Sequence, residues 1–253
     1  MKRNEFEIAH IWALPGISKL FVETWDKGRI AVRTDEIVCI TQKTDSQGCT
    51  VLVKKEASEM EINYDFEASI ADFEKFLPPN LFVHIQGNKL LNLAKVDRII
   101  NHDLYVGKHS FTMGKKHYDE VLSHFVIDGL NDQAIQFDKL AVPDSIFVWE
   151  KKQYVKIEYR HIQWIRAEGN YTYISQDNQE RLICTVCSLA KWKARLPSPP
   201  FQIVHRSYLV NLNLVTGIGN NKLYLMNHEI PIPKGKVKET KEFFSIMKRE
   251  NKK

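Results

Sequence analysis

A short pattern of apolar residues, typical of a helix with one buried face, occurs twice in the chain. Each copy begins at a serine, Ser69 or Ser188, whose hydroxyl can accept a backbone hydrogen bond and so cap a helix. The apolar positions are Ile70, Phe73 and Leu77 in the first copy and Leu189, Trp192 and Leu196 in the second. This spacing places them on one face. Prolines directly follow both copies, and proline ends a helix, so the pattern predicts two short helices.

These helices belong to a longer internal repeat with a constant offset of 119 residues. The later matches are Phe82 with Phe201, Leu90–Leu93 with Leu209–Leu212, Val96 with Val215, Ile99 with Ile218, Leu104–Tyr105 with Leu223–Tyr224, and Lys115 with Lys234. A repeat in a single register over this length predicts two copies of one folding unit.

Runs rich in β-branched and aromatic residues precede both helices and predict strands. They are Leu20–Glu23, Arg29–Val32 and Ile37–Ile40 in the first half, and Ile146–Trp149, Tyr154–Ile157, Ile162–Ile165 and Tyr171–Ile174 in the second. Gly219–Lys222 reads as a turn between two later strands. The predicted fold is mainly β with one short helix per repeat, as two tandem domains of related fold over residues 18–125 and 145–250. Turn signals in residues 126–144 indicate a connection, and residues 1–17 suggest no role.

Charge is divided unequally between the two halves. Residues 1–130 contain 16 Lys and Arg against 19 Asp and Glu, a net charge of −3, whereas residues 131–253 contain 20 against 12, a net charge of +8. Such a division favours an anionic partner for the second half. The alternative is a basic surface without a partner.

The second half resembles a known family. Residues 145–250 resemble the LytTR DNA-binding domain of bacterial response regulators. The resemblance rests on Ile165–Tyr171, Ser188–Leu189, Phe201–Asn211 and Ile230–Lys234, and within these His205–Asn211 is the most specific stretch. It implies a ten-stranded, mainly β fold that places loops in the major groove of double-stranded DNA. The first half resembles a degenerate second copy of the same domain.

The resemblance also implies which residues contact DNA. They are Asn170 and Tyr171, then His205, Arg206 and Ser207, and then Lys234. The family has Ser and Arg after its Ile-Pro-Val motif, whereas this chain has Pro233–Lys236, so the bidentate fork of arginine is lost while the charge is kept. We therefore expect Lys234 and Lys236 to contact phosphates.

Each candidate residue has a structural alternative. Arg206 can donate two hydrogen bonds to guanine, or it can lie in a surface ion pair. His205 can contact DNA or pack internally, and Asn170 can simply form a β-turn after Gly169. Tyr208 is expected in the core, and Asn211 is expected to hold backbone rather than DNA. The basic run Lys234, Lys236, Lys238 and Lys241 is either a phosphate clamp or a solvated face.

The first half lacks the DNA-contacting motifs. Gln86–Asn88 occupies the register of His205–Ser207, and Thr44–Ser46 replaces the Glu-Gly-Asn-Tyr stretch, although Lys115 and Lys116 remain. Because this half is net negative, we expect it to serve as a docking, dimerising or sensing copy that does not bind DNA. A ligand-sensing or protein-interaction module centred on this copy is the alternative function.

Other classes of protein are disfavoured. No catalytic motif, P-loop or metal-binding spacing is present, so no enzyme activity, cofactor or metal is expected. Cys184 and Cys187 lie in a strand-like run and are interpreted as ordinary thiols. Few cysteines and no apolar run of about 20 residues predict a cytoplasmic protein without membrane spans. We therefore predict a sequence-specific transcription regulator that binds promoter direct repeats, with homodimerisation as a candidate property.

Overall fold

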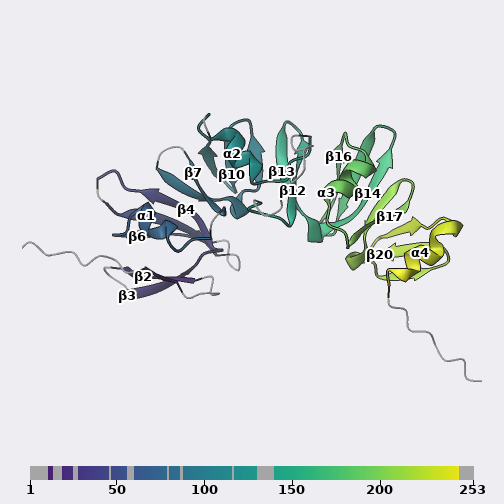
Figure 1. Ribbon diagram of the computed structural model, residues 1–253, viewed down its shortest axis with the longest axis horizontal. Coiled ribbons are helices and arrows are strands. Elements are labelled where there is room, and N and C mark those ends of the chain that lie inside the picture. Colours follow the sequence, from purple (N-terminus) through teal and green to yellow (C-terminus); the bar gives the residue numbers. More distant parts are fainter. Residues whose placement is uncertain are drawn as a thin grey trace, which may run out of the picture. The chain divides into compact units, whose positions relative to one another are not determined.

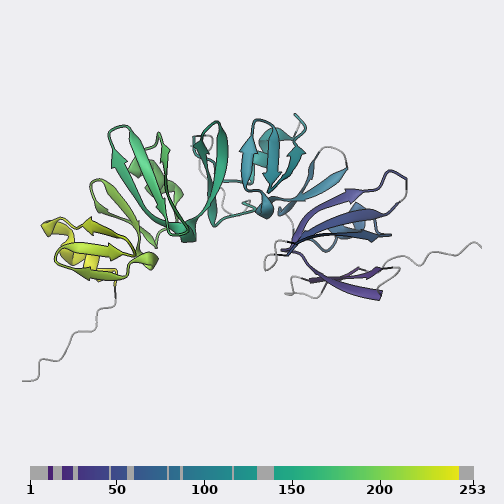
Figure 2. The same ribbon diagram turned by 180° about the vertical axis from the view of Figure 1, so that it is seen from behind.

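The chain forms two compact units in the computed structural model, which describes residues 11–13, 19–24, 28–45, 47–55, 60–78, 80–85, 88–115, 117–129 and 140–244. Unit 1 comprises Met1–Pro143 and Lys152–Lys156, and unit 2 comprises Asp144–Lys151 and Ile157–Lys253. Both units are built mainly from antiparallel strands, with a few short helices (Figures 1 and 2).

Unit 2 contains a five-stranded sheet followed by a three-stranded sheet. The first has the order β16-β15-β14-β18-β17, and the second has the order β19-β20-β21. The first sheet is formed by β14 (Ile162–Glu168), β15 (Tyr171–Gln176), β16 (Gln179–Thr185), β17 (Phe201–His205) and β18 (Tyr208–Asn211), with α3 (Leu189–Arg195) between β16 and β17. The chain continues through η4 (Leu212–Leu214), β19 (Gly217–Gly219), β20 (Lys222–Leu225), β21 (His228–Pro231), η5 (Lys234–Lys236) and α4 (Val237–Glu242).

Unit 1 repeats this order of elements. Its five-stranded sheet has the order β6-β5-β4-β8-β7, the same connectivity as in unit 2. The elements are β4 (Ile37–Gln42), β5 (Cys49–Lys54), β6 (Glu61–Phe66), α1 (Ile70–Glu74), β7 (Phe82–Ile85), β8 (Lys89–Asn92), η1 (Leu93–Lys95), β9 (Arg98–Ile100), β10 (Asp103–Val106), β11 (His109–Thr112) and α2 (Tyr118–Ser123). From α1 to α2 every helix and strand begins 119 residues before its counterpart in the second repeat. The predicted repeat is therefore a structural repeat.

A β-hairpin precedes the five-stranded sheet of each repeat. The first hairpin is β2 (Lys19–Thr24) with β3 (Gly28–Arg33), and β1 (Ile11–Ala13) pairs with β2. The second is β12 (Ser145–Glu150) with β13 (Gln153–Glu158), followed by η3 (Tyr159–His161). Strand β13 also pairs with β9, in a sheet of order β11-β10-β9-β13-β12.

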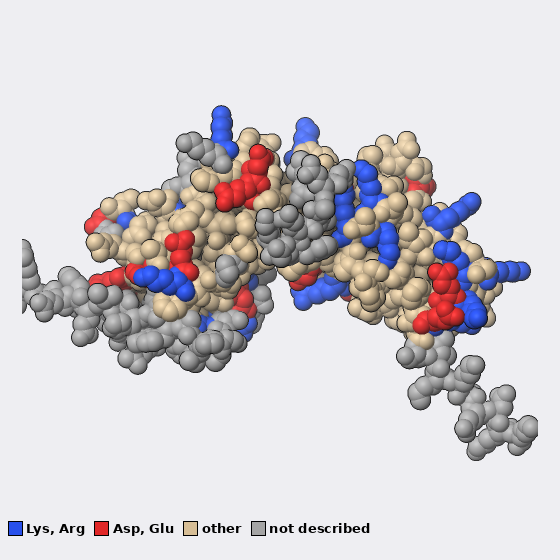
Figure 3. Space-filling view, in the orientation of Figure 1, with Lys and Arg blue, Asp and Glu red and all other residues tan. Residues whose placement is uncertain are grey.

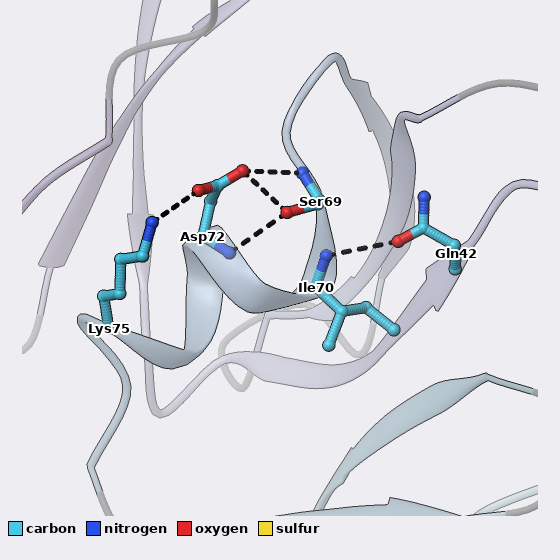
Figure 4. A network of polar contacts seen from close by, with 5 residues as sticks. All are labelled: Gln42, Ser69, Ile70, Asp72 and Lys75. Atoms are coloured by element: carbon cyan, nitrogen blue, oxygen red, sulfur yellow. Dashed lines mark hydrogen bonds and ion pairs between the residues drawn. The ribbon is translucent and has the colours of Figure 1, made fainter.

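Hydrogen bonds at its first turn fix the start of α1. The hydroxyl of Ser69 accepts from the Asp72 backbone N–H (3.3 Å), and the Asp72 carboxylate accepts from the Ser69 backbone N–H (3.2 Å). Gln42 Oε1 accepts from the Ile70 backbone N–H (3.2 Å), so a strand side chain also caps the helix (Figure 4). The hydrogen bonds from Lys75 and Ser69 lower the pKa of Asp72 to about 2. Ser188 caps α3 in the predicted way by accepting from the Lys191 backbone N–H (3.3 Å).

The predicted apolar faces of α1 and α3 are buried. All six residues that define them are buried, and Trp192 and Phe73, which occupy equivalent positions, are among the largest fully buried side chains. The indole Nε1 of Trp192 also donates a hydrogen bond to Thr172 Oγ1 (2.9 Å), which satisfies two buried polar groups at once. The helices therefore hold their sheets through large buried side chains.

A buried asparagine at the end of β8 and of β18 ties the chain together in both repeats. Asn92 Nδ2 donates to the Ile37 carbonyl (2.8 Å), and its Oδ1 accepts from the Ala94 backbone N–H (3.0 Å). Asn211 does the same toward the Tyr159 carbonyl (3.3 Å) and the Asn213 backbone N–H (3.1 Å). Asn211 is thus a structural residue, as its position in the motif suggested.

Two features were not anticipated from the sequence. Each repeat ends in a second short helix, α2 or α4, and in both views α4 lies against the sheet of β19–β21 (Figures 1 and 2). The packed part of unit 1 continues past residue 125, since Val126 and Ile127 are fully buried. Residues 130–139 of the expected connection, and residues 1–10 and 14–17 of the segment without an assigned role, lie outside the described residues.

The cysteines and helices of the described part of the chain add two observations. All four cysteines are free thiols, of which Cys184 is exposed on β16, and no group of His, Cys, Asp and Glu that could hold a metal occurs among the described residues. No described helix is long and apolar enough to cross a membrane.

Candidate nucleic-acid interface

Two hairpin turns of unit 2 present the predicted contact residues to solvent. The first joins β14 to β15, where Glu168 pairs with Tyr171 and only Gly169 and Asn170 form the turn. Gly169 has a φ of +60°, a conformation that favours glycine. Asn170 is exposed and Tyr171 is 50% exposed, so both side chains are free to meet a partner.

The second turn joins β17 to β18 and carries His205, Arg206 and Ser207. The backbone N–H of Ser207 donates to His205 Nδ1 (3.1 Å). Because Nδ1 accepts, the ring proton of the neutral imidazole lies on Nε2, which is left as a donor. Arg206 is exposed and forms no hydrogen bond or ion pair with any residue in the described part of the chain. Its guanidinium is therefore available as a donor fork.

The two turns lie at the same end of the sheet. The Ala167 backbone N–H donates to the Ser207 carbonyl (2.9 Å), and Arg166 pairs with Tyr208 across the neighbouring strands. Arg166 itself is occupied, since Nη2 donates to Glu168 Oε2 (3.0 Å) and the guanidinium lies over the Tyr173 ring at 5.5 Å. The structure thus brings Asn170, Tyr171 and the His205–Ser207 turn together, and it leaves Arg166 as a supporting residue.

An aromatic cluster supports this end of the sheet. His228 stacks on Trp164, with ring centroids 4.6 Å apart and an interplanar angle of 26°. Tyr208 packs against Trp164 at 5.9 Å and against His205 at 5.9 Å. Tyr208 is half-buried in this cluster, so its ring links the core to the turn. The cluster also brings His228, the first residue of β21, close to Tyr208, with ring centroids 6.3 Å apart.

Sequence reasoning missed His228. A single histidine surrounded by unremarkable residues has no motif around it, and its importance arises from packing that the sequence does not show. One signal was available, because His228 lies 119 residues after His109 and so occupies an equivalent place in the repeat. In unit 1, however, His109 Nε2 hydrogen-bonds to Glu61 Oε2 (3.1 Å), so the two histidines have different partners.

His228 gives a testable dependence of stability on pH. Burial, together with the nearby positive charge of Arg166, lowers its pKa below 6.5. Between the lowered value and 6.5 the unfolded chain binds more protons than the folded chain, so this contribution is present above 6.5 and is lost as the pH falls. Acidification from about pH 7.5 to about 5.5 should therefore destabilise the wild type more than His228→Gln in urea unfolding. An equal loss in both proteins would show that His228 does not carry the effect.

The two lysines of the predicted site lie apart from the turns along the chain. Lys234 is exposed and Lys236 half-buried in η5, which follows the end of β21 opposite to His228. The buried Ile232, whose backbone N–H donates to the Asn221 carbonyl (2.7 Å), anchors this segment. No hydrogen bond or ion pair in the described part of the chain joins either lysine to the turns. Lys and Arg side chains gather over the α4 end of unit 2, beside a smaller acidic group (Figure 3).

Unit 1 keeps the scaffold of this site but not its turns. The Gln42 backbone N–H donates to the Asn88 carbonyl (3.1 Å), which is the equivalent of the Ala167–Ser207 hydrogen bond. The loop from β4 to β5 is longer, and Gln42 Nε2 holds it by donating to the Gln47 and Gly48 carbonyls. Asn88 has a φ of 49°, and Thr44, Asp45 and Lys115 are exposed. Gln86, Gly87, Ser46 and Lys116 lie outside the described residues.

Comparison with known proteins identifies the class to which these features belong. A β domain that presents adjacent turns with unpaired donors, in the basic half of the chain, is suited to bind a nucleic acid. The family model of the LytTr DNA-binding domain matches residues 152–245. Residues 152–245 therefore form a LytTr DNA-binding domain, and the family model does not match the first half of the chain.

A solved structure that is similar to part of the chain is the LytTr DNA-binding domain of a protein described as a methyl-accepting/DNA response regulator from Bacillus cereus. It is 18% identical, covers 39% of this chain and 94% of its own, and superposes with a TM-score of 0.35. No curated protein matches the chain.

Proposed function

We propose that the protein is a sequence-specific transcription regulator that binds double-stranded DNA at promoter direct repeats through unit 2. In this proposal the turns at Gly169–Asn170 and Arg206–Ser207 enter the major groove. Arg206 reads a guanine, and His205 contacts a base edge through Nε2. Asn170, Tyr171, Ser207, Lys234 and Lys236 mainly contact the backbone and fix the position of the domain.

One observation carries the proposal. The part of the chain that matches the LytTr DNA-binding domain also contains Arg206, an exposed arginine that has no partner among the described residues and lies in a turn held by backbone hydrogen bonds. An arginine with no internal partner does not have to give up an ion pair in order to bind a base. Its position on an ordered turn lowers the entropic cost of contact.

The first repeat is assigned a supporting role. We propose residues 18–125 as a docking, dimerising or sensing copy, residues 126–144 as the connection, and residues 145–250 as the DNA-binding domain. The longer loop that Gln42 holds and the net charge of −3 over residues 1–130 support this division of labour, because both differ from the second half where DNA would bind. One chain then covers one site, and a pair of direct repeats requires two chains.

The proposal predicts a strong dependence of binding on salt. If the basic half neutralises about four to six phosphates, the slope of log K against log salt concentration should be roughly −4 to −5, because binding releases condensed counterions. The slope is measured by fluorescence anisotropy with the full chain and a duplex obtained by selection from random sequences. A nearly flat response would reject the electrostatic part of the proposal, and a selection that enriches no motif would reject sequence specificity.

A further inference from the structure

The two repeats differ at one sheet edge. In unit 1 the outer edge of β9 is covered by β13, with Tyr154 opposite Ile99 and Val155 opposite Arg98. The Lys156 backbone N–H donates to the Asp97 carbonyl (3.0 Å), and Lys156 Nζ donates to the Ala94 carbonyl (2.8 Å). The strand that covers this edge belongs to the hairpin that introduces the next repeat.

The equivalent strand in unit 2 is β19, and no described strand pairs with its outer edge. It lies at the edge of the sheet β19-β20-β21. The side of β19 that faces β20 has the same hydrogen bond as in unit 1. The Thr216 backbone N–H donates to the Tyr224 carbonyl (2.8 Å), and the equivalent Asp97 backbone N–H donates to the Tyr105 carbonyl (2.9 Å). An edge strand of this kind has backbone groups that another strand can pair with.

Side chains at this edge show the same difference. In unit 1 the exposed fractions of Leu93, Val96 and Ile99 are 0%, 0% and 1%. Their counterparts in unit 2, Leu212, Val215 and Ile218, are only partly buried. The residue types are retained while the burial is not, so unit 2 leaves uncovered the apolar surface that a following hairpin covers in unit 1.

A strand that could cover this edge exists in the same chain. Strand β3 is the second strand of the first hairpin, as β13 is of the second hairpin, and it begins 125 residues before β13. It is an edge strand in the order β1-β2-β3, and no other described strand pairs with it. Ala31 in β3 is equivalent to Lys156 in β13, and Thr216 before β19 is equivalent to Asp97 before β9. Ala31 and Thr216 are both exposed.

We propose that β3 of one copy of the chain pairs with β19 of a second copy, in the register that β13 adopts on β9, with Ala31 opposite Thr216. In unit 1 the strand that covers this edge is β13, from the hairpin of the following repeat, and in the proposal β3 of a second copy takes the same place beside β19. The contact joins different surfaces of the two copies, so it is head-to-tail and can continue from copy to copy. It does not depend on DNA binding.

The pairing is short, so the association should be weak in free solution. Stable interfaces bury about 1,200–2,000 Å², and a contact of a few residue pairs buries less. Trapping by a disulfide is therefore the suitable test. Directly opposed residues in antiparallel strands have Cα atoms about 4.5–5.5 Å apart, within the range that a disulfide bridges.

The experiment mixes two full-length variants, one with Ala31→Cys and one with Thr216→Cys, both carrying Cys184→Ser to remove the exposed native thiol. Under mild oxidation at high protein concentration we expect a covalent dimer that contains one of each chain. The matched control replaces Ala31→Cys by Lys19→Cys, an exposed position on the neighbouring strand β2, and should give several-fold less dimer. Circular dichroism verifies that each variant is folded.

Two outcomes would overturn the proposal. The first is a mixture that gives no more dimer than the Lys19→Cys control. The second is a chain with both Ala31→Cys and Thr216→Cys that forms only an internal disulfide, which would show that the hairpin of the same chain covers β19. If Ala31→Cys does not fold, Arg29→Cys with Ile218→Cys tests the next pair of the same register, and the same outcomes decide.

Discussion

Replacing Arg206 by alanine should weaken binding to the selected DNA by about 1–3 kcal/mol, or about 5- to 150-fold, and should relax the preference at one base position. The side chain is exposed, it has no partner among the described residues, and its turn is held by the Ser207–His205 hydrogen bond. Its removal should therefore leave the fold intact. Affinity is measured on the selected duplex and on duplexes with each base pair changed in turn.

Three variants separate the roles of charge and geometry. Arg160→Ala removes the same charge from an exposed arginine of unit 2 that is ion-paired with Glu158 (2.6 Å), and it should have little effect. Lys236→Ala should weaken binding to all sequences equally. Arg206→Lys keeps the charge but lacks the fork, so it should restore affinity only in part and without base preference. Full preference in Arg206→Lys would show that this residue contacts phosphate rather than guanine.

Replacing Trp192 by alanine should lower the free energy of unfolding of unit 2 by about 3–5 kcal/mol. The side chain is fully buried between α3 and the five-stranded sheet, and its indole donates to the buried Thr172 hydroxyl. The substitution would leave a large cavity and an unpaired polar group. Urea unfolding followed by circular dichroism measures the loss, which should affect the transition of unit 2 and not that of unit 1.

The first repeat supplies the control for this variant. Phe73 fills the equivalent position without a hydrogen-bond donor. Trp192→Phe should therefore keep most of the packing and lose mainly the hydrogen bond to Thr172, at a cost of about 1–3 kcal/mol. If Trp192→Ala and Trp192→Phe cost the same, packing by the indole is not what holds α3 to its sheet.

Much of the fold follows from local patterns. The helices after Ser69 and Ser188, the strands before them and the repeat register were predictable, because apolar periodicity and caps act over a few residues. The full extent of the repeat was not predictable, because the offset between equivalent strands is 126 from β2 to β12, 125 from β3 to β13 and 119 from α1 onward, as the loops differ in length. A comparison at one fixed offset cannot follow such changes.

The candidate site divides in the same way. Asn170 and Arg206 could be proposed from the sequence because they belong to contiguous motifs, and each lies exposed in a turn of the structure. The supporting residues were not found, because Trp164, Tyr208 and His228 come from three strands that are distant in sequence. The interactions of Arg166 with the Glu168 carboxylate and the Tyr173 ring also depend on strand register. The alternation of residue types alone does not determine that register.

Equivalent backbone hydrogen bonds, from Ala167 to Ser207 and from Gln42 to Asn88, make this fold suitable for exchanging the turns at this end of the sheet. In both repeats this hydrogen bond joins neighbouring strands just before the turn begins. The turn can therefore change length without disturbing the five-stranded sheet. The two repeats already differ in this way. Six residues follow Gln42 before the next strand in the first repeat, whereas two residues separate Glu168 from Tyr171 in the second. These turns are therefore suitable positions at which new recognition sequences can be grafted onto either repeat.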